Sequence, residues 1–80
     1  MKQMNDCLDR FFEGRTPLKA KWQARWHKDH SHIMILFHYQ HVVLVYDTTE
    51  QKVLQEWWEV PTDKRGLDAA KEYLAKKEWT

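Results

Sequence analysis

The sequence predicts an α+β domain that contains an N-terminal helix, a three- or four-stranded antiparallel β meander and a C-terminal helix. Hydrophobic residues recur at helical spacing near both ends of the chain and alternate with polar residues through its middle. Because the helical segments flank the strands and do not alternate with them, the order favours an antiparallel sheet over a parallel nucleotide-binding fold. A chain of 80 residues has room for one core, so we expect residues 1–80 to form a single domain.

Both predicted helices are amphipathic. The first spans about residues 2–13, and its apolar positions are Met1, Met4, Leu8, Phe11 and Phe12. It is followed by Gly14 and Pro17, which favour an end to the helix. The second spans about residues 63–78, and its apolar positions include Leu67, Ala70 and Leu74.

In two segments, apolar and polar residues alternate as they do in strands with one buried and one exposed face. Residues 19–27 alternate apolar and basic side chains, which predicts a strand with one apolar and one basic face before a polar turn at 28–31. Residues 53–60 alternate again after a polar connector at 47–52, and this last strand is expected to end at Pro61.

The central segment, residues 32–47, is apolar on both faces. Ile33, Ile35 and Phe37 share one face, while Met34 and Leu36 share the other. The segment is either two strands that turn at residues 38–41 or one long bent strand, and no Gly, Asn or Pro supports a tight turn there. Two short helices suffice to cover one face, so we expect a second copy of the chain to cover the other.

The composition excludes several kinds of site. The single cysteine, Cys7, leaves no disulfide framework and no multi-cysteine zinc site. The two glycines, Gly14 and Gly66, are isolated and form no phosphate-binding loop, so no cofactor is predicted. The chain shows neither a signal-peptide pattern nor a segment apolar enough to span a membrane, which predicts a cytoplasmic protein without a membrane partner.

The charge is distributed unevenly along the chain. The net charge is +1, yet residues 15–31 carry +4 and residues 32–60 carry −3. The asymmetry predicts a basic patch and an acidic patch on one small body, each able to meet a complementary surface.

The basic face of the first predicted strand is a candidate nucleic-acid-binding site. Alternate residues of a strand stand about 7 Å apart, comparable to the spacing of phosphates along a nucleic-acid strand. The site would consist of Lys19, Lys21, Arg25 and Lys28. However, Trp22 and Trp26 are expected on the opposite face of the strand, where they cannot stack a base whose phosphate the basic residues hold.

Three of the five tryptophans are candidate partner-binding residues. Trp57 and Trp58 are adjacent in the last predicted strand, so one indole is expected on each face of the sheet. Trp79 follows the C-terminal helix, beyond its amphipathic part. Tryptophan is enriched among the residues that anchor protein–protein contacts.

The histidines gather near the two turns. His27, His30 and His32 surround Asp29, and a histidine paired with this carboxylate could act as an acid–base pair in a metal-free ribonuclease. Ser31-His32 resembles part of the Ser-His-His stretch of the small mRNA-interferase toxins with a double-stranded-RNA-binding-like fold. The resemblance covers only these residues and lacks the glycine that accompanies the stretch, so the family is not assigned. The histidine spacing is looser than that of metal motifs.

These features favour a small, non-enzymatic protein-interaction module of the adaptor or inhibitor type, which forms a homodimer and binds a regulatory protein. Proteins of this kind include those carried by phages and mobile elements. The alternative is a nucleic-acid-binding module that uses the basic strand face. The third hypothesis is a histidine-dependent ribonuclease or a metal site. No catalytic and no metal-ligating residue is predicted.

Overall fold

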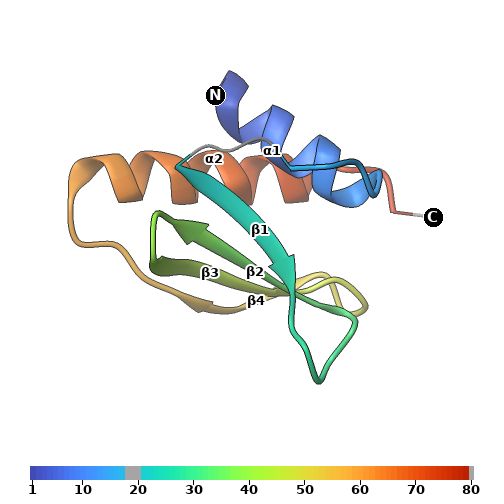
Figure 1. The fold of residues 1–80 in the computed structure, drawn as a ribbon. Helices are drawn as coiled ribbons and strands as arrows, with labels where there is room; N and C mark the ends of the chain where they lie inside the picture. Colours follow the sequence, from blue (N-terminus) through green and yellow to red (C-terminus); the bar gives the residue numbers. More distant parts are fainter. Residues whose placement is uncertain (18–20, 80) are drawn as a thin grey trace.

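The computed structural model describes residues 1–17 and 21–79 and confirms the predicted α+β fold (Figure 1). Its elements are α1 (Lys2–Phe12), β1 (Trp22–Trp26), β2 (Ile33–His38), β3 (His41–Asp47), β4 (Lys52–Glu56) and α2 (Pro61–Lys76). The strands form one antiparallel sheet in the order β1-β2-β3-β4. Lys19, at the predicted start of the first strand, lies outside the described residues.

Residues 38–41 form a tight hairpin, which decides between the two alternatives in favour of two strands, although no Gly, Asn or Pro marks the turn. His38 pairs with His41, which leaves Tyr39 and Gln40 as the turn. Tyr39 replaces the missing glycine because it adopts a φ of 57°, a left-handed conformation that bulky residues rarely take. A residue held in this conformation costs about 1–3 kcal/mol. The turn therefore contains strained backbone at an aromatic residue.

A β-bulge in β3 allows two consecutive side chains of this strand to be buried in the core. The pairing with β2 shifts by one residue between Leu36 and Phe37, and the extra residue on β3 is Val43. Val43 and Leu44 are consecutive, yet both are fully buried. A second bulge adds Leu54 to β4, next to the paired residues Gln55 and Val45.

Both helices cover the same face of the sheet (Figure 1). Directly paired strand residues share a face, so contacts to α2 identify the covered one. Glu56 of β4 pairs its carboxylate with Lys71 of α2, and His38 of β2 contacts Asp63 of α2. The core on this face consists of Met4, Leu8, Trp22, Met34, Leu36, Val43, Leu44, Tyr46, Leu67, Ala70 and Leu74.

The two helices are joined by a hydrogen bond between Tyr73 of α2 and Asp9 of α1. The Tyr73 hydroxyl donates to Asp9 Oδ1 over 2.6 Å. Burial, with a smaller contribution from Asp9, raises the pKa of Tyr73 above its ordinary value. The hydroxyl therefore stays protonated and continues to donate over the whole physiological range of pH.

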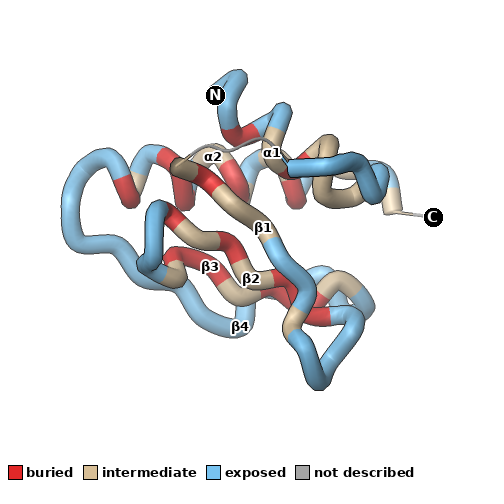
Figure 2. The backbone as a smooth tube through the Cα atoms, viewed as in Figure 1, coloured by how far each residue is buried: buried red, intermediate tan, exposed pale blue. Residues whose placement is uncertain are grey.

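The last strand is shorter than predicted. β4 ends at Glu56, so Trp57 and Trp58 lie beyond the strand, and the expectation of one indole on each sheet face was wrong. The Trp57 N–H donates to the Val43 carbonyl at 3.0 Å, after which the chain leaves the sheet to reach Pro61 at the start of α2. Figure 2 shows this connecting segment as exposed along its length.

Gly66 of α2 allows the closest approach between the helix and the sheet. A Cβ atom at this position would lie 1.9 Å from Trp22 Cη2 and within 2.5 Å of two further atoms of the same six-membered ring. The indole of Trp22 therefore packs directly against the helix backbone. Any larger residue at position 66 must displace a buried ring.

We expect Gly66→Ala to destabilise the fold, although alanine is the better helix former by about 1 kcal/mol. Overpacking against Trp22 should outweigh that gain and lower the free energy of unfolding by about 1–3 kcal/mol in urea denaturation. Trp22→Phe removes the ring atoms that an added Cβ would meet, so the double variant should lose less than the sum of the single losses. Additive losses would contradict the close packing described above.

Candidate interaction surfaces

An exposed aromatic surface lies at one end of the molecule, where the β2–β3 turn, the segment 57–60 and the start of α2 meet (Figure 1). We call this the aromatic surface and define it as Tyr39, His41, Trp57, Trp58 and Val60. The exposed fractions are 66% for Tyr39, 49% for Trp58 and 36% for Trp57. The surface brings together two of the predicted partner-binding residues, Trp57 and Trp58.

Neighbouring side chains fix the orientation of both indoles. The rings of His41 and Trp57 stack with their centroids 5.3 Å apart and an interplanar angle of 26°. The Lys64 ammonium lies 5.9 Å from the centroid of the Trp58 ring, within the range of a cation–π contact. Both indoles are therefore held in place while much of their surface stays in solvent.

Beneath the aromatic surface lies a buried pair, His38 and Asp63. His38 Nδ1 is hydrogen-bonded to Asp63 Oδ1, and both side chains are almost fully buried. The other carboxylate oxygen, Asp63 Oδ2, accepts the N–H groups of Glu59 and Val60, each at 3.2 Å. Asp63 thus joins the end of β2 to the first turn of α2 and satisfies backbone donors that the helix leaves free.

The surroundings of Asp63 stabilise its charged form. The hydrogen bond from His38 is the largest influence, and together with the two backbone N–H groups it holds the pKa of Asp63 below its ordinary value despite burial. The position of Asp63 in the first turn of α2 also favours a negative charge there.

The pair is enclosed and does not form a reactive site. The ring of His38 stacks on the indole of Trp22 at 4.1 Å. His38 Nε2 and Trp22 Nε1 are both buried, and neither has a hydrogen-bond partner among the described residues. A general base needs a nitrogen that a substrate can reach, and Nε2 of His38 is not reachable in this arrangement.

The other histidines remain near the surface of the β1–β2 turn. The rings of His27 and His30 lie 4.9 Å apart, and those of His30 and His32 lie 6.2 Å apart. His27 Nδ1 accepts the backbone N–H of Asp29. His32 Nε2 lies 3.9 Å from Asp47 Oδ2, so among the described residues the carboxylate next to these histidines is Asp47 and not the expected Asp29. Within residues 1–17 and 21–79, no three His, Cys, Asp or Glu side chains come together as a metal site requires.

The face of the sheet opposite the helices is apolar along its centre. Ile35 pairs with Arg25 and Val45, and Phe37 pairs with Gln23 and Val42, so these side chains point away from α1 and α2. Ile35, Phe37, Val42 and Val45 are only half-buried. We call this the open face. Among the elements that the structure describes, neither helix lies on it (Figure 1).

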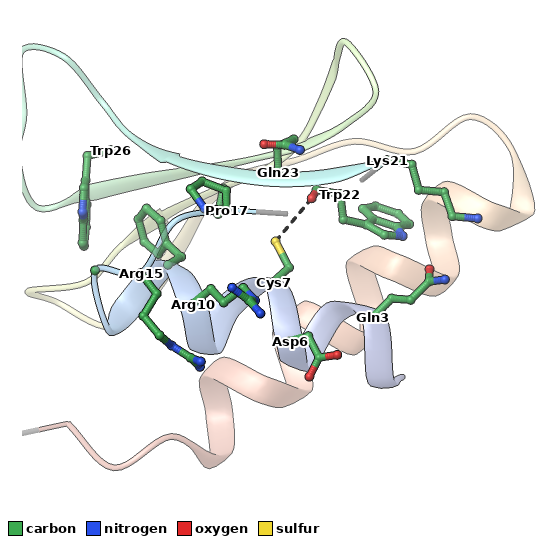
Figure 3. A pocket seen from close by; sticks show the side chains of 13 residues that line it. Gln3, Asp6, Cys7, Arg10, Arg15, Pro17, Lys21, Trp22, Gln23 and Trp26 are labelled. Carbon is green, nitrogen blue, oxygen red and sulfur yellow. Dashed lines mark hydrogen bonds between the residues drawn. The ribbon is translucent and has the colours of Figure 1, made fainter. Parts of the chain in front are cut away.

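The β1 edge of the sheet is closed by α1. The odd-numbered residues of β1 use their backbone groups to bond to β2; for example, the Tyr39 N–H donates to the Lys21 carbonyl at 2.7 Å. The backbone groups of the even-numbered residues Trp22 and Ala24 therefore point outward, away from the sheet. The Cys7 thiol of α1 meets them there and donates to the Trp22 carbonyl at 3.5 Å (Figure 3). Burial raises the pKa of Cys7, and the backbone N–H of Ala24 partly offsets the rise.

A groove of about 700 Å³ runs along this edge between α1 and β1 (Figure 3). Its apolar lining includes Cys7, Phe11, Trp22 and Trp26. Basic side chains border it, but Arg10 donates to the Thr16 carbonyl and Arg15 pairs with Glu13.

The remaining predicted site residues are dispersed. Trp79 packs against the rings of Phe12 and Tyr46 instead of joining Trp57 and Trp58. Lys21 borders the groove, Arg25 lies over Phe37 on the open face with 5.6 Å to the ring centroid, and Lys28 belongs to the β1–β2 turn. Lys19 lies outside the described residues.

Two important residues were missed in the sequence. Tyr39 carries no recognisable signal in the sequence, because nothing local distinguishes a tyrosine that will take a positive φ. Asp63 is the third residue after Val60, the N-cap of α2, and an acidic side chain at this position commonly accepts the backbone N–H of the N-cap residue. That spacing could have indicated the cap, but the partner His38 lies 25 residues away in the sequence.

Comparison with protein-family models, curated proteins and solved structures finds no match. Across residues 1–17 and 21–79, neither helix has the length and apolar character needed to cross a bilayer.

We expect the lowered pKa of Asp63 to make stability fall in acid. The contribution of this carboxylate is fully present above its ordinary pKa and is lost as the pH falls through its lower, folded-state pKa. At neutral pH, Asp63→Asn should lower the free energy of unfolding by about 3–5 kcal/mol, because it breaks a buried pair. The free energy of unfolding of this variant should also fall less steeply than that of the wild type as the pH is lowered.

Asp68→Asn is the matched control, since Asp68 lies on the same helix and pairs with Lys64 in solvent. Its loss should stay below about 1 kcal/mol. Both variants are measured by urea denaturation across a pH series. Equal losses in the two would show that the contact with His38 contributes nothing to the free energy of unfolding.

Proposed function

We propose that the chain is a small, non-enzymatic protein-interaction module of the adaptor or inhibitor type, which self-associates in the cytoplasm and binds a regulatory protein partner. The observation that carries the proposal is the aromatic surface. Trp and Tyr are the residue types that most often anchor protein contacts, and here they are held in defined orientations at one end of a small domain.

The energetics support a contact role for Tyr39. Its positive φ is strained, and its side chain is the most exposed of the large hydrophobic residues noted in the described part of the chain. Glycine would remove the strain and would lose the contact of the Tyr39 ring with the ring of His38, whose centroid lies 4.8 Å away. The rest of the Tyr39 side chain is exposed on a strained turn and is available for contact with another molecule.

The arrangement of the histidines favours a binding role over catalysis. The buried histidine–carboxylate pair, His38 and Asp63, is enclosed beneath Trp22 and links a strand to a helix. Of the surface histidines of the β1–β2 turn, His32 has its Nε2 3.9 Å from Asp47 Oδ2, which is longer than a hydrogen bond. The groups with acid–base chemistry thus have structural or solvated roles, whereas the exposed groups are aromatic.

We expect Tyr39→Gly to act in opposite directions on stability and on binding. Relief of the strained turn should raise the free energy of unfolding by about 1 kcal/mol, measured by urea denaturation. The same substitution should weaken partner binding, as should the double variant Trp57→Ser/Trp58→Ser. Binding is measured by capture from an extract of the source cells on immobilised wild-type and variant proteins.

Val53→Ser is the control for capture, because Val53 is also exposed but lies in β4 outside the aromatic surface. A partner retained equally by the wild type, the Tyr39 variant and the tryptophan double variant would contradict the proposal. Loss of the same partner with Val53→Ser alone would place the contact elsewhere.

We expect no salt-sensitive binding of single-stranded DNA or RNA oligonucleotides. Trp22 is buried, and Trp26 is 44% exposed but lies on the face of the strand opposite Arg25 and packs on Phe11 at 4.6 Å, so no indole of β1 is beside Arg25 to stack a base. Tryptophan fluorescence is followed during titration at low and at moderate salt. Binding that strengthens as salt falls and disappears in Lys21→Glu/Arg25→Glu would favour the nucleic-acid alternative.

A further inference from the structure

We propose that the groove between α1 and β1 binds a small carboxylate with an apolar tail, of the kind that a medium-chain fatty acid represents. The apolar walls of the groove take the tail, and the Arg10 guanidinium holds the carboxylate. This inference goes beyond the proposed function, because it concerns a small molecule and a part of the molecule that the aromatic surface does not include.

The groove results from a small residue that lies between two large ones. Trp22, Ala24 and Trp26 point to the same face of β1, the face that the helices cover. The two indoles project on either side of the Ala24 methyl group, so α1 meets a hollow where it packs along the strand. The volume of about 700 Å³ lies within the range of about 300–1,000 Å³ that is typical of sites for small ligands.

The walls of the groove suit an apolar chain. Phe11 of α1 and Trp26 of β1 contact each other at one end, with their ring centroids 4.6 Å apart, and Trp26 is 44% exposed. In the middle, the Cys7 thiol donates to the Trp22 carbonyl, so this outward backbone acceptor already has a partner. An alkyl chain in the groove would remove apolar area from water without leaving that carbonyl unpaired.

The charge around the groove is predominantly positive. Among the described residues that line it, three are basic, Arg10, Arg15 and Lys21, and one is acidic, Asp6 (Figure 3). Arg15 is neutralised by Glu13, since its Nε lies 2.7 Å from Glu13 Oε1. The groove therefore favours a ligand that carries negative charge.

Arg10 is the best placed of these side chains to hold a carboxylate. It is half-buried and lies next to Phe11 and one turn after Cys7 on α1, so it belongs to the side of the helix that lines the groove. Its Nη1 donates to the Thr16 carbonyl, a neutral acceptor. Within residues 1–17 and 21–79, no carboxylate lies within ion-pair distance of Arg10 or Lys21. The guanidinium thus keeps an uncompensated charge and further N–H donors, which match a carboxylate in planar geometry.

The two properties together select the class of ligand. A cation would meet the positive charge of Arg10 and Lys21, and a neutral apolar molecule would leave that charge without a counter-charge. A small polar anion such as inorganic phosphate would leave the apolar walls in water. A molecule with one carboxylate and an apolar tail satisfies both the walls and the rim of the groove.

Nuclear magnetic resonance titration of the full chain with decanoate, kept below the concentration at which it forms micelles, tests the proposal. The backbone N–H resonances of Phe11 and Ala24 and the indole N–H resonance of Trp26 should shift and reach saturation. The dissociation constant should increase with salt. Decanol and decyltrimethylammonium have the same alkyl chain without the carboxylate, and they should bind at least about tenfold more weakly.

Two variants test the roles of charge and of volume. Arg10→Gln should raise the dissociation constant for decanoate about tenfold, because a charge-assisted hydrogen bond is lost. Arg65→Gln is the control, with the same change of charge at an exposed position of α2 outside the groove. Ala24→Ile should abolish binding, because the larger side chain fills the hollow between the two indoles.

Several results would overturn the inference. They are the absence of a saturable shift with decanoate, equal binding of decanol, and equal weakening by Arg10→Gln and Arg65→Gln. Shifts confined to Trp57 and Trp58, or to Ile35 and Phe37 of the open face, would place the alkyl chain on another apolar surface. None of these results would alter partner capture by the aromatic surface, so the two proposals fail separately.

Discussion

The contact between His38 and Asp63 holds the two layers of this domain together. It is buried, it joins the end of β2 to the first turn of α2, and its histidine ring supports the indole of Trp22. The same carboxylate accepts the N–H groups of Glu59 and Val60, which fixes the end of the segment that bears Trp57 and Trp58. The order of the aromatic surface therefore depends on an ionisable pair that solvent does not reach.

Covering a sheet on one side only has consequences for a chain of this length. The helices bury Met34, Leu36 and Leu44 completely, while Ile35, Phe37 and Val45 on the other side remain half-exposed. A small domain buries a modest fraction of its surface, so apolar area left on a sheet is a considerable loss of potential stability. Contact with a second surface would recover that loss, and association and folding would then reinforce each other.

Much of the fold could be predicted from the sequence because its elements have strong periodicities. Helical spacing of apolar residues from Met4 to Phe12 predicted the first helix. Apolar residues on both faces from Ile33 to Leu36 predicted a strand at the centre of the sheet. The end of the last strand could not be predicted, because Trp57 and Trp58 continue the alternation of Val53 and Gln55 after the chain has left the sheet. Alternation of apolar and polar residues indicates which side chains share a face of a strand, but it does not show where hydrogen bonding to a neighbouring strand stops.

The candidate site was predicted in part. Trp57 and Trp58 were identified because tryptophan is enriched among the residues that anchor protein–protein contacts, but Tyr39 joins them only through the geometry of the turn. Trp79 was grouped with them on the same reasoning, and its burial against Phe12 and Tyr46 depends on how α2 ends. The link between His38 and Asp63 connects distant parts of the chain, and no local pattern predicts such a contact.

The thiol of Cys7 has a consequence for the size of any assembly. A sheet with a free edge can template strand after strand, which is how soluble domains are converted into fibrils. Here α1 packs along β1 and its Cys7 thiol donates to the outward carbonyl of Trp22, while the bulge at Leu54 distorts the opposite margin of the sheet. Growth by strand addition is thereby disfavoured at both edges of the sheet, although apolar side chains remain exposed on its open face.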